Sequence, residues 1–269
     1  CWGDHRGGAL GSNRVCAPPT VEGAAPNCIL GAGVVAALPP VRALAAGDDV
    51  TCAITTEDRV VCWGVASRVG GSTLPALDPP TPVRLPDATP LTAARVIIGA
   101  GAVCAIDRAA ALWCWGDGFG ALPVRQPQVG VVDVAIGARH RCVIDAAGLA
   151  CWGDNRNGQV GDVAAARACD PRGACEIAAP HHVELDARRV VVGERHTCAL
   201  DGAGVVSCWG SNEVGQLGRA DAFLVGDIAP ALADATGLGA GYAHACAQRA
   251  DGAVWCWGAT DVTDPAEAL

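Results

Sequence analysis

The chain has 269 residues, a formal net charge of −9 and 51% hydrophobic residues, yet only two Phe, one Tyr and no Met. This length suffices for one large β-domain or two small domains, and Val, Leu, Ala, Cys and eight Trp must fill most of the core. The acidic balance, with no basic cluster larger than two Arg residues, argues against binding of nucleic acid through its phosphate backbone.

No stretch of the sequence is suited to a membrane-spanning helix. The most apolar one, residues 29–41, is broken by glycine and proline and is shorter than the roughly 20 residues that a bilayer requires. The chain starts on Cys1 rather than on Met, so we expect either a mature product or part of a larger parent polypeptide. All 19 basic residues are Arg, a bias typical of a GC-rich bacterial genome.

A repeated tripeptide dominates the sequence. Cys-Trp-Gly begins at Cys1, Cys62, Cys114, Cys151, Cys208 and Cys256. Five of these cysteines follow an earlier one at a nearly constant distance: Cys52, Cys104, Cys142, Cys198 and Cys246. A glycine stands five residues before each of the five: Gly47, Gly99, Gly137, Gly193 and Gly241. Self-similarity of this kind indicates a repeat architecture.

The fullest repeat spans residues 193–218. Two short apolar runs flank a turn at residues 201–204, Asp-Gly-Ala-Gly, which predicts a β-hairpin. The copy at residues 137–161 has the same layout, with Asp145 and Gly148 in its turn, whereas residues 1–11 match only the second half. Because no 3.6-residue period runs through any copy, the sequence predicts an all-β fold.

The repeat reads G-x-x-H-x-C-A-L…G-x-V-x-C-W-G-x-N-x-x-G-Q-L-G, and it resembles the regulator of chromosome condensation repeat family, in a bacterial cysteine-rich form. The resemblance implies a β-propeller, typically of about seven blades. We therefore expect an all-β propeller of about six to seven blades, with an incomplete ring as the alternative because one repeat is truncated. The expected organisation is a single propeller domain over residues 1–269, with a truncated first repeat at 1–11 and inserts at 12–39 and 162–180.

The hairpin geometry predicts disulfides. A turn centred near residue 203 places Cys198 opposite Cys208, within the range that a disulfide accepts. The same construction pairs Cys52 with Cys62, Cys104 with Cys114, Cys142 with Cys151, and Cys246 with Cys256. The inserts add two expected pairs, Cys16 with Cys28 and Cys169 with Cys175, and leave Cys1, whose partner would fall upstream.

The cysteines have two other conceivable roles, as zinc ligands or as free thiols. The spacing between the paired cysteines is not that of a structural zinc site. Free buried thiols in a reducing cytosol are the alternative to disulfides, because cysteine also packs as a small hydrophobe. Disulfides indicate an oxidising compartment, so we expect an extracellular or cell-envelope protein.

Histidines are the first candidates for chemistry. His140, His196 and His244 each stand two residues before a hairpin cysteine, and a propeller would separate this repeated slot onto different blades. A structural role is therefore expected for all three. His181 and His182 follow a proline and are expected in a solvent-facing linker, with a weak metal site as the alternative.

Carboxylates and tryptophans have ordinary explanations too. The pairs Asp48–Asp49 and Glu57–Asp58 are expected in solvated turns rather than in a catalytic site. The Cys-Trp-Gly tryptophans are expected to pack between blades: Trp2, Trp63, Trp115, Trp152, Trp209 and Trp257. Trp113 and Trp255 are additional, and we expect them in the core, with surface anchors as the alternative.

The sequence contains no nucleophile elbow, zinc-protease helix or phosphate-binding loop. We therefore expect no catalytic residues, no metal and no cofactor, and a non-enzymatic scaffold that binds an unidentified protein or surface macromolecule through its loops. The two inserts are candidate binding loops. The resemblance implies two alternatives: guanine-nucleotide exchange on a small GTPase, and inhibition of an enzyme such as a β-lactamase by a propeller.

The disulfide pairing can be tested by counting thiols. Alkylation of denatured, unreduced protein followed by mass spectrometry should give about one free thiol per chain, because seven pairs account for all but one of the 15 cysteines. Fifteen free thiols in protein taken from its native compartment would contradict the expected oxidising location.

Overall fold

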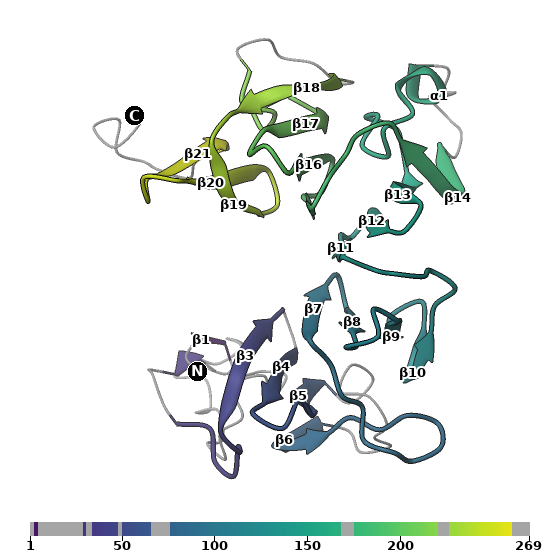
Figure 1. Cartoon of the computed structure of the whole chain (residues 1–269), viewed down its shortest axis with the longest axis vertical. Helices are drawn as coiled ribbons and strands as arrows, with labels where there is room; N and C mark the ends of the chain where they lie inside the picture. Colours follow the sequence, from purple (N-terminus) through teal and green to yellow (C-terminus); the bar gives the residue numbers. More distant parts are fainter. Residues whose placement is uncertain are drawn as a thin grey trace, which may run out of the picture. The chain divides into compact units, whose positions relative to one another are not determined.

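The computed structural model describes residues 3–4, 29–30, 34–47, 50–65, 76–167, 175–219 and 226–259. The chain divides into two compact units, Cys1–Gly130 and Val131–Leu269 (Figure 1). Each unit is considered by itself below.

The first unit contains two four-stranded antiparallel sheets. One sheet runs in chain order through β3 (Val41–Ala46), β4 (Val50–Thr55), β5 (Val60–Val65) and β6 (Ala76–Pro82). The other runs through β7 (Arg95–Gly99), β8 (Ala102–Ile106), β9 (Leu112–Gly116) and β10 (Gly120–Arg125). Two short strands, β1 (Gly3–Asp4) and β2 (Ile29–Leu30), pair with each other.

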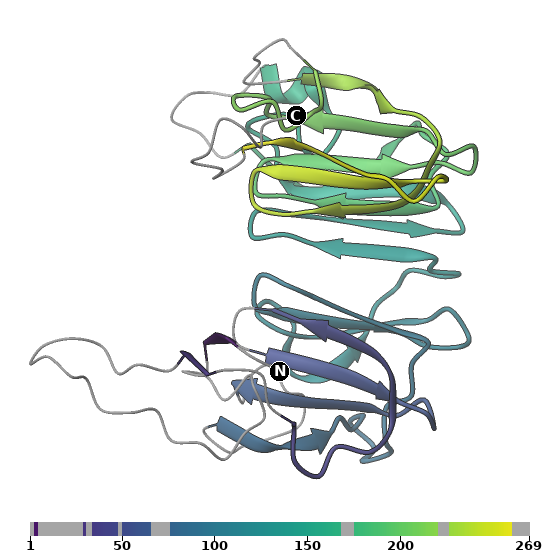
Figure 2. The same ribbon diagram turned by 90° about the vertical axis from the view of Figure 1, so that its left-hand side faces the viewer.

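The second unit contains three sheets of the same design, which Figure 2 shows stacked face to face. The first comprises β11 (Asp133–Ile136), β12 (His140–Asp145), β13 (Gly148–Asp154) and β14 (Glu176–Val183). The second comprises β15 (Arg189–Val192), β16 (His196–Leu200), β17 (Val206–Gly210) and β18 (Gly226–Leu232). The third has three strands, β19 (Ala235–Ala240), β20 (His244–Arg249) and β21 (Val254–Gly258). Their first strands, β11, β15 and β19, contact one another in turn.

These five up-and-down sheets are propeller blades, which we number 1 to 5 in chain order. The all-β propeller prediction is confirmed, but the predicted count of six to seven blades is too high for the described residues, which form five. The family's usual blade number misled the prediction, because only five repeats of this chain contain a complete hairpin. The second insert contains a short helix, α1 (Val163–Arg167), and no helix in the described part of the chain could span a membrane.

The hairpins have the register predicted from the cysteine spacing. In each blade the two cysteines face each other across the second and third strands and are bonded, with Cα atoms 4.1–4.2 Å apart. The pairs are Cys52–Cys62, Cys104–Cys114, Cys142–Cys151, Cys198–Cys208 and Cys246–Cys256. Cys175 is also disulfide-bonded, whereas Cys1, Cys16, Cys28 and Cys169 lie outside the described residues.

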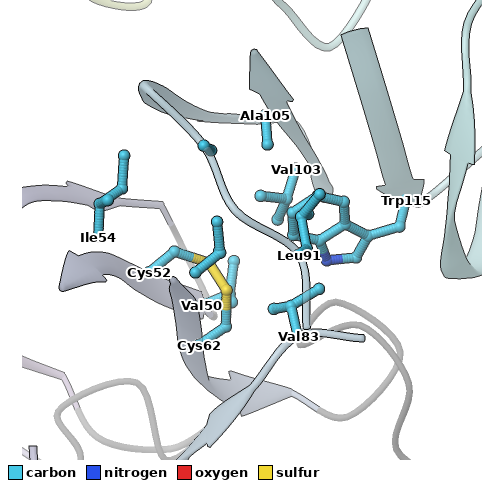
Figure 3. Packing of buried hydrophobic residues seen from close by; sticks show 11 residues of the cluster. Val50, Cys52, Ile54, Cys62, Val83, Leu91, Val103, Ala105 and Trp115 are labelled. Atoms are coloured by element: carbon cyan, nitrogen blue, oxygen red, sulfur yellow. A yellow bond between two sulfur atoms is a disulfide. The ribbon is translucent and has the colours of Figure 1, made fainter. Parts of the chain in front are cut away.

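The hairpin disulfides of blades 1 to 4 are buried, whereas in blade 5 Cys246 is half-buried and Cys256 is exposed. In the first unit, the Cys52–Cys62 disulfide of blade 1 is buried, and Leu91 packs beside it together with Val103 and Trp115 of blade 2 (Figure 3). Strands β4 and β8 are buried along their whole length, because neighbouring structure covers both of their faces. This explains why the apolar runs of the sequence do not alternate with polar residues.

The glycine before His196 and the glycine before His244 have a steric cause. A Cβ atom on Gly193 would overlap the imidazole ring of His196, and the same holds for Gly241 and His244. The ring of the histidine thus occupies the space that a side chain on the glycine would need.

We expect Gly193→Ala to lower the free energy of unfolding by about 1–3 kcal/mol, because the new methyl group must displace a fully buried ring. Urea denaturation of the disulfide-intact protein measures this difference. The matched control is Gly202→Ala, whose Cβ would meet nothing within 4 Å and should change stability by less than about 0.5 kcal/mol. Equal losses for the two variants would contradict the steric explanation.

Candidate functional site

Neighbouring blades of the second unit are joined by tryptophan. The indole N–H of Trp209 in blade 4 donates to the main-chain carbonyl of Gln159, 3.0 Å away, in the loop that follows β13 of blade 3. The indole of Trp257 in blade 5 makes the same 3.0 Å bond to Gln216, in the loop after β17 of blade 4. These two Cys-Trp-Gly tryptophans therefore contact the preceding blade, as the sequence predicts. Trp2 lies outside the described residues.

The loops that present these carbonyls share one internal frame. In the first, the side chain of Asn155 accepts from Val160 N at 3.0 Å and donates to Asp162 O at 2.7 Å. In the second, Asn212 accepts from Leu217 N at 2.8 Å and donates to Arg219 O at 3.1 Å. The repeated N-x-x-G-Q-[VL]-G sequence thus encodes a loop that is closed by its own asparagine; we call the two copies the asparagine loops.

A second kind of turn lies at the same end of each blade. In the G-x-x-H turns, at residues 137–140, 193–196 and 241–244, the glycine N–H donates to the histidine carbonyl at 2.9–3.0 Å. The residue before each histidine accepts from the residue after Cys-Trp-Gly at 2.8–2.9 Å: Asp154 N to Arg139 O, Ser211 N to Arg195 O, and Ala259 N to Ala243 O. These bonds fix three turns in one geometry on three successive blades.

The tips of these turns differ, and a charged network joins them. Arg139 Nε lies 3.0 Å from Glu194 Oε1, so it bridges blades 3 and 4, and its Nη1 lies 3.5 Å from Asp154 Oδ2. The hydroxyl of Tyr242, on blade 5, and the guanidinium of Arg139 both donate to Glu194 and hold the pKa of this carboxyl below its usual range. The same contact with Glu194 raises the pKa of Arg139 and of Tyr242.

Beside this network lies a depression of about 230 Å³, formed by the turns of blades 4 and 5 and the second asparagine loop. Its lining comprises Glu194, Arg195, Glu213, Val214, Gln216, Tyr242 and Ala243. Tyr242 is 70% exposed and Val214 is 49% exposed, so an aromatic and an aliphatic side chain face solvent within a charged rim. We call Arg139, Asp154 and these lining residues together the loop surface. It can bind a partner, because an aromatic anchor within a polar rim is typical of protein interfaces.

No sequence motif pointed to the loop surface. Arg139, Glu194 and Tyr242 occupy variable positions of different repeats, between the constant glycine and histidine. The sequence could have indicated this surface only through the variation of the two residues between the constant glycine and histidine.

Two of the three repeated histidines, His140 and His196, are buried. His140 is buried; its Nε2 lies 2.7 Å from Thr197 Oγ1, which in turn donates to Gln159 O, so the imidazole supports the contact between blades 3 and 4. Burial, with a smaller effect of His196, lowers the pKa of His140 to about 3. Burial also lowers the pKa of His196 to about 4, whereas His244 is exposed.

The other candidate residues do not come together. His181 and His182 lie in strand β14, not in a linker as predicted, because they pair with Cys151 and Ala150 of β13. Adjacent strand residues point to opposite faces, so these two imidazoles cannot share a metal ion. Among the described residues, no three His, Cys, Asp or Glu side chains are grouped to hold a metal.

The carboxylate pairs do not form a catalytic dyad in the described part of the chain. Asp58 is not merely solvated but binds Arg42 and Arg108, with Arg42 Nη2 at 2.8 Å, and Arg108 chiefly lowers its pKa. Glu57 pairs separately with Arg59 at 3.3 Å. Asp48 and Asp49 lie outside the described residues.

The two additional tryptophans differ from each other, since Trp113 packs against the core of the first unit as predicted and Trp255 does not. Trp113 is half-buried, and its indole donates to Asp107 at 3.1 Å. Trp255 is 53% exposed on β21, so the core prediction is wrong for this residue. Its exposure follows from its place on the outermost described strand of blade 5.

Comparisons with known proteins agree with this architecture. Residues 41–67 and 187–216 match the regulator of chromosome condensation (RCC1) repeat. The structure of Kap60 bound to yeast RCC1 (Prp20) is similar at a TM-score of 0.67 and 22% identity, over 82% of this chain and 56% of that one. The structure of Prp20p from Saccharomyces cerevisiae is similar at a TM-score of 0.62 and 22% identity, over 82% of this chain and 57% of that one. The structure of human WBSCR16 is similar at a TM-score of 0.56 and 17% identity, over 96% of this chain and 88% of that one. These likenesses show the fold, and this chain spans little more than half the length of the two yeast chains.

The buried histidines predict loss of stability in acid. Folded His140 stays neutral down to a pKa of about 3, whereas in the unfolded chain it protonates near pH 6.5. The unfolded state therefore binds more protons below pH 6.5, and the free energy of unfolding falls by up to about 1.4 kcal/mol per pH unit from this residue. Urea denaturation at pH 7.5 and 5.0 should show a smaller loss for His140→Gln than for the unmodified chain. His182→Gln, at an exposed histidine of β14, is the control and should lose as much as the unmodified chain.

Proposed function

We propose that this chain, which carries RCC1 repeats on a propeller fold, is a non-enzymatic scaffold that binds a protein partner through the loop surface. One observation supports this most directly. The G-x-x-H turns of blades 3, 4 and 5 keep the same main-chain hydrogen bonds, while their two central residues change from Ala-Arg to Glu-Arg to Tyr-Ala. A constant frame with variable tips is the arrangement expected where a rigid scaffold presents side chains for recognition.

The loop surface is ordered before any partner arrives. Glu194 is held by Arg139 and by the Tyr242 hydroxyl, and the main-chain N–H of Glu194 donates to Tyr242 O at 2.9 Å. The tyrosine ring thus remains 70% exposed although its hydroxyl is fixed. Fixing these side chains in advance lowers the entropy lost on binding, by about 0.5–1.5 kcal/mol for each one.

The disulfides favour an exported protein. The five hairpin disulfides of the described residues are stable in an oxidising environment and would be reduced in most cytosols. We therefore propose an extracellular or cell-envelope location. The buried histidines give no support to an enzyme, since His140 and His196 are enclosed between blades and lie on different sheets.

A regulator of a small GTPase is the second candidate. The observation in its favour is structural similarity to Prp20p, a protein described by its binding to Gsp1p and histones. Acceleration of nucleotide release from a GTPase by the purified chain would favour this candidate over a surface scaffold.

Binding through the loop surface can be tested with a double variant. The immobilised chain is incubated with a cross-linked envelope fraction of its source cells and should retain a partner. The double variant Val214→Ala/Tyr242→Ala should bind this partner at least about tenfold more weakly, because each truncation removes an exposed anchor. Quantitative mass spectrometry of the retained proteins, followed by binding curves with the purified partner, measures the difference.

The matched control is Val129→Ala, at a valine that is 71% exposed in the first unit. The control should retain the partner as the unmodified chain does. A partner that binds the double variant and the unmodified chain equally well would rule out the loop surface as its binding site.

A further inference from the structure

The depression on the loop surface has an exposed aromatic wall. The ring of Tyr242 is 70% exposed, yet its hydroxyl donates to Glu194 and is held there. A phenol that donates to a carboxylate gains electron density in its ring, because its O–H bond becomes more polar. The face of such a ring attracts cations, guanidinium groups more often than ammonium groups. The ring is thus fixed in place, open to solvent and polarised toward a positive charge.

A second wall of the depression carries an exposed carboxylate. Glu213 directly follows the asparagine of the second asparagine loop, and its side chain is 42% exposed. In the described part of the chain its one ion pair is with Arg195, at 3.5 Å, which is longer than a strong charge-assisted hydrogen bond. Glu194 differs, because Arg139 binds it at 3.0 Å and Tyr242 donates to it. Glu213 therefore retains the capacity to accept hydrogen bonds from a ligand.

Several hydrogen-bond donors of the lining are used inside the protein. The main-chain N–H of Glu213 donates to Ser211 Oγ at 3.4 Å, and that of Val214 donates to Gln216 Oε1 at 2.9 Å. The side-chain amide of Gln216 donates in turn to Ser211 at 3.3 Å. Arg195 is the one cation of the lining, and both carboxylates of the lining lie within 3.7 Å of its guanidinium. An incoming anion would therefore meet two negative charges around this cation.

We propose that the depression binds an arginine side chain of the partner, whose guanidinium stacks on the Tyr242 ring and pairs with Glu213. This inference rests on the proposed function, since the loop surface is there the binding site of the partner. Two carboxylates and one guanidinium give the lining a formal charge of −1, and the whole chain carries −9, so a cation is attracted at short and at long range. Val214, which is 49% exposed, can cover the methylene groups of the same arginine.

The turn of blade 5 leaves room for this cation. In blades 3 and 4 the residue before the histidine is an arginine, Arg139 and Arg195, whereas in blade 5 it is Ala243, which lines the depression. An arginine at this position would place a positive charge beside the ring and repel a second one. Arginine also fits the site better than lysine, because a planar guanidinium can stack on a ring and pair with a carboxylate at the same time.

The chain contains a single tyrosine, which makes the test direct. In the full chain labelled with ring-13C tyrosine, the NMR signals of the label report on Tyr242 alone. Titration with N-acetyl-arginine amide should shift these signals along a saturable curve with a Kd of about 1–10 mM, as expected for one stacking contact and one ion pair. The neutral isostere N-acetyl-citrulline amide should bind at least about tenfold more weakly.

A charge-matched pair of variants identifies the carboxylate. Glu213→Gln should weaken binding of the arginine probe at least about fivefold, because it removes the paired charge. The control is Glu184→Gln, which removes the same charge from an exposed residue beyond the Leu149–Val183 pair, at the end of blade 3 opposite Asp154. The control should bind the probe as the unmodified chain does.

Three outcomes would overturn the proposal: equal binding of the arginine and citrulline probes, equal binding of the arginine probe by Glu213→Gln and the unmodified chain, or saturable shifts with N-acetyl-glutamate amide instead. The last would assign the depression to an anionic side chain bound by Arg195.

Failure of this inference can be told apart from failure of the proposed function. Loss of the partner in Val214→Ala/Tyr242→Ala without binding of the arginine probe would keep the proposed function and refute the arginine. Binding of the probe with undiminished retention of the partner by that variant would refute the loop surface as the partner's site, and with it the assignment of the arginine to that partner.

Discussion

The hydrogen bond from a tryptophan indole to a glutamine main-chain carbonyl is the contact on which the repeat depends. Trp209 is completely buried, and a buried indole N–H without an acceptor costs about 1–3 kcal/mol. Its acceptor, Gln159 O, belongs to the preceding blade and also binds Thr197. The asparagine loop holds this carbonyl in place. The N-x-x-G-Q sequence of one repeat is therefore explained by the tryptophan of the next repeat, which binds that carbonyl.

A core with few aromatic residues requires a second source of rigidity. The hairpin cysteines supply it, since each pair fixes the register of its two strands, and in blades 1 to 4 the pair is also buried at the centre of the blade. Short-loop disulfides of this kind contribute about 2–3 kcal/mol each in the chain-entropy model. Register and stability therefore come from the same residues. This leaves the turns at the blade ends free to vary, and the loop surface is composed of such turns.

The sequence predicted what is local in this fold. Each disulfide is contained within a hairpin, so the cysteine spacing and the turn residues were sufficient to assign five bonds. The blade count failed because it was borrowed from a family rather than read from the five complete hairpins. His181 was assigned to a linker because it follows Pro180; its strand geometry comes from pairing with β13, which no local pattern reveals. Trp255 was assigned to the core because tryptophans beside a buried cysteine are more often buried than exposed, whereas its actual exposure depends on the neighbours of β21 in space.

The loop surface was missed because it is made by neighbours in space and not in sequence. Arg139 and Glu194 are 55 residues apart, yet they meet because the same turn recurs on adjacent blades. Repetition therefore has two effects, and only the first of them is visible in the sequence. It conserves the residues that build the frame, and these can be found by comparing the repeats. It also brings the unlike residues between them onto one face, and these become recognisable only when the stacking of the blades is known. In a repeat protein, the positions that break the pattern inside a constant turn are thus the first place to search for a binding surface.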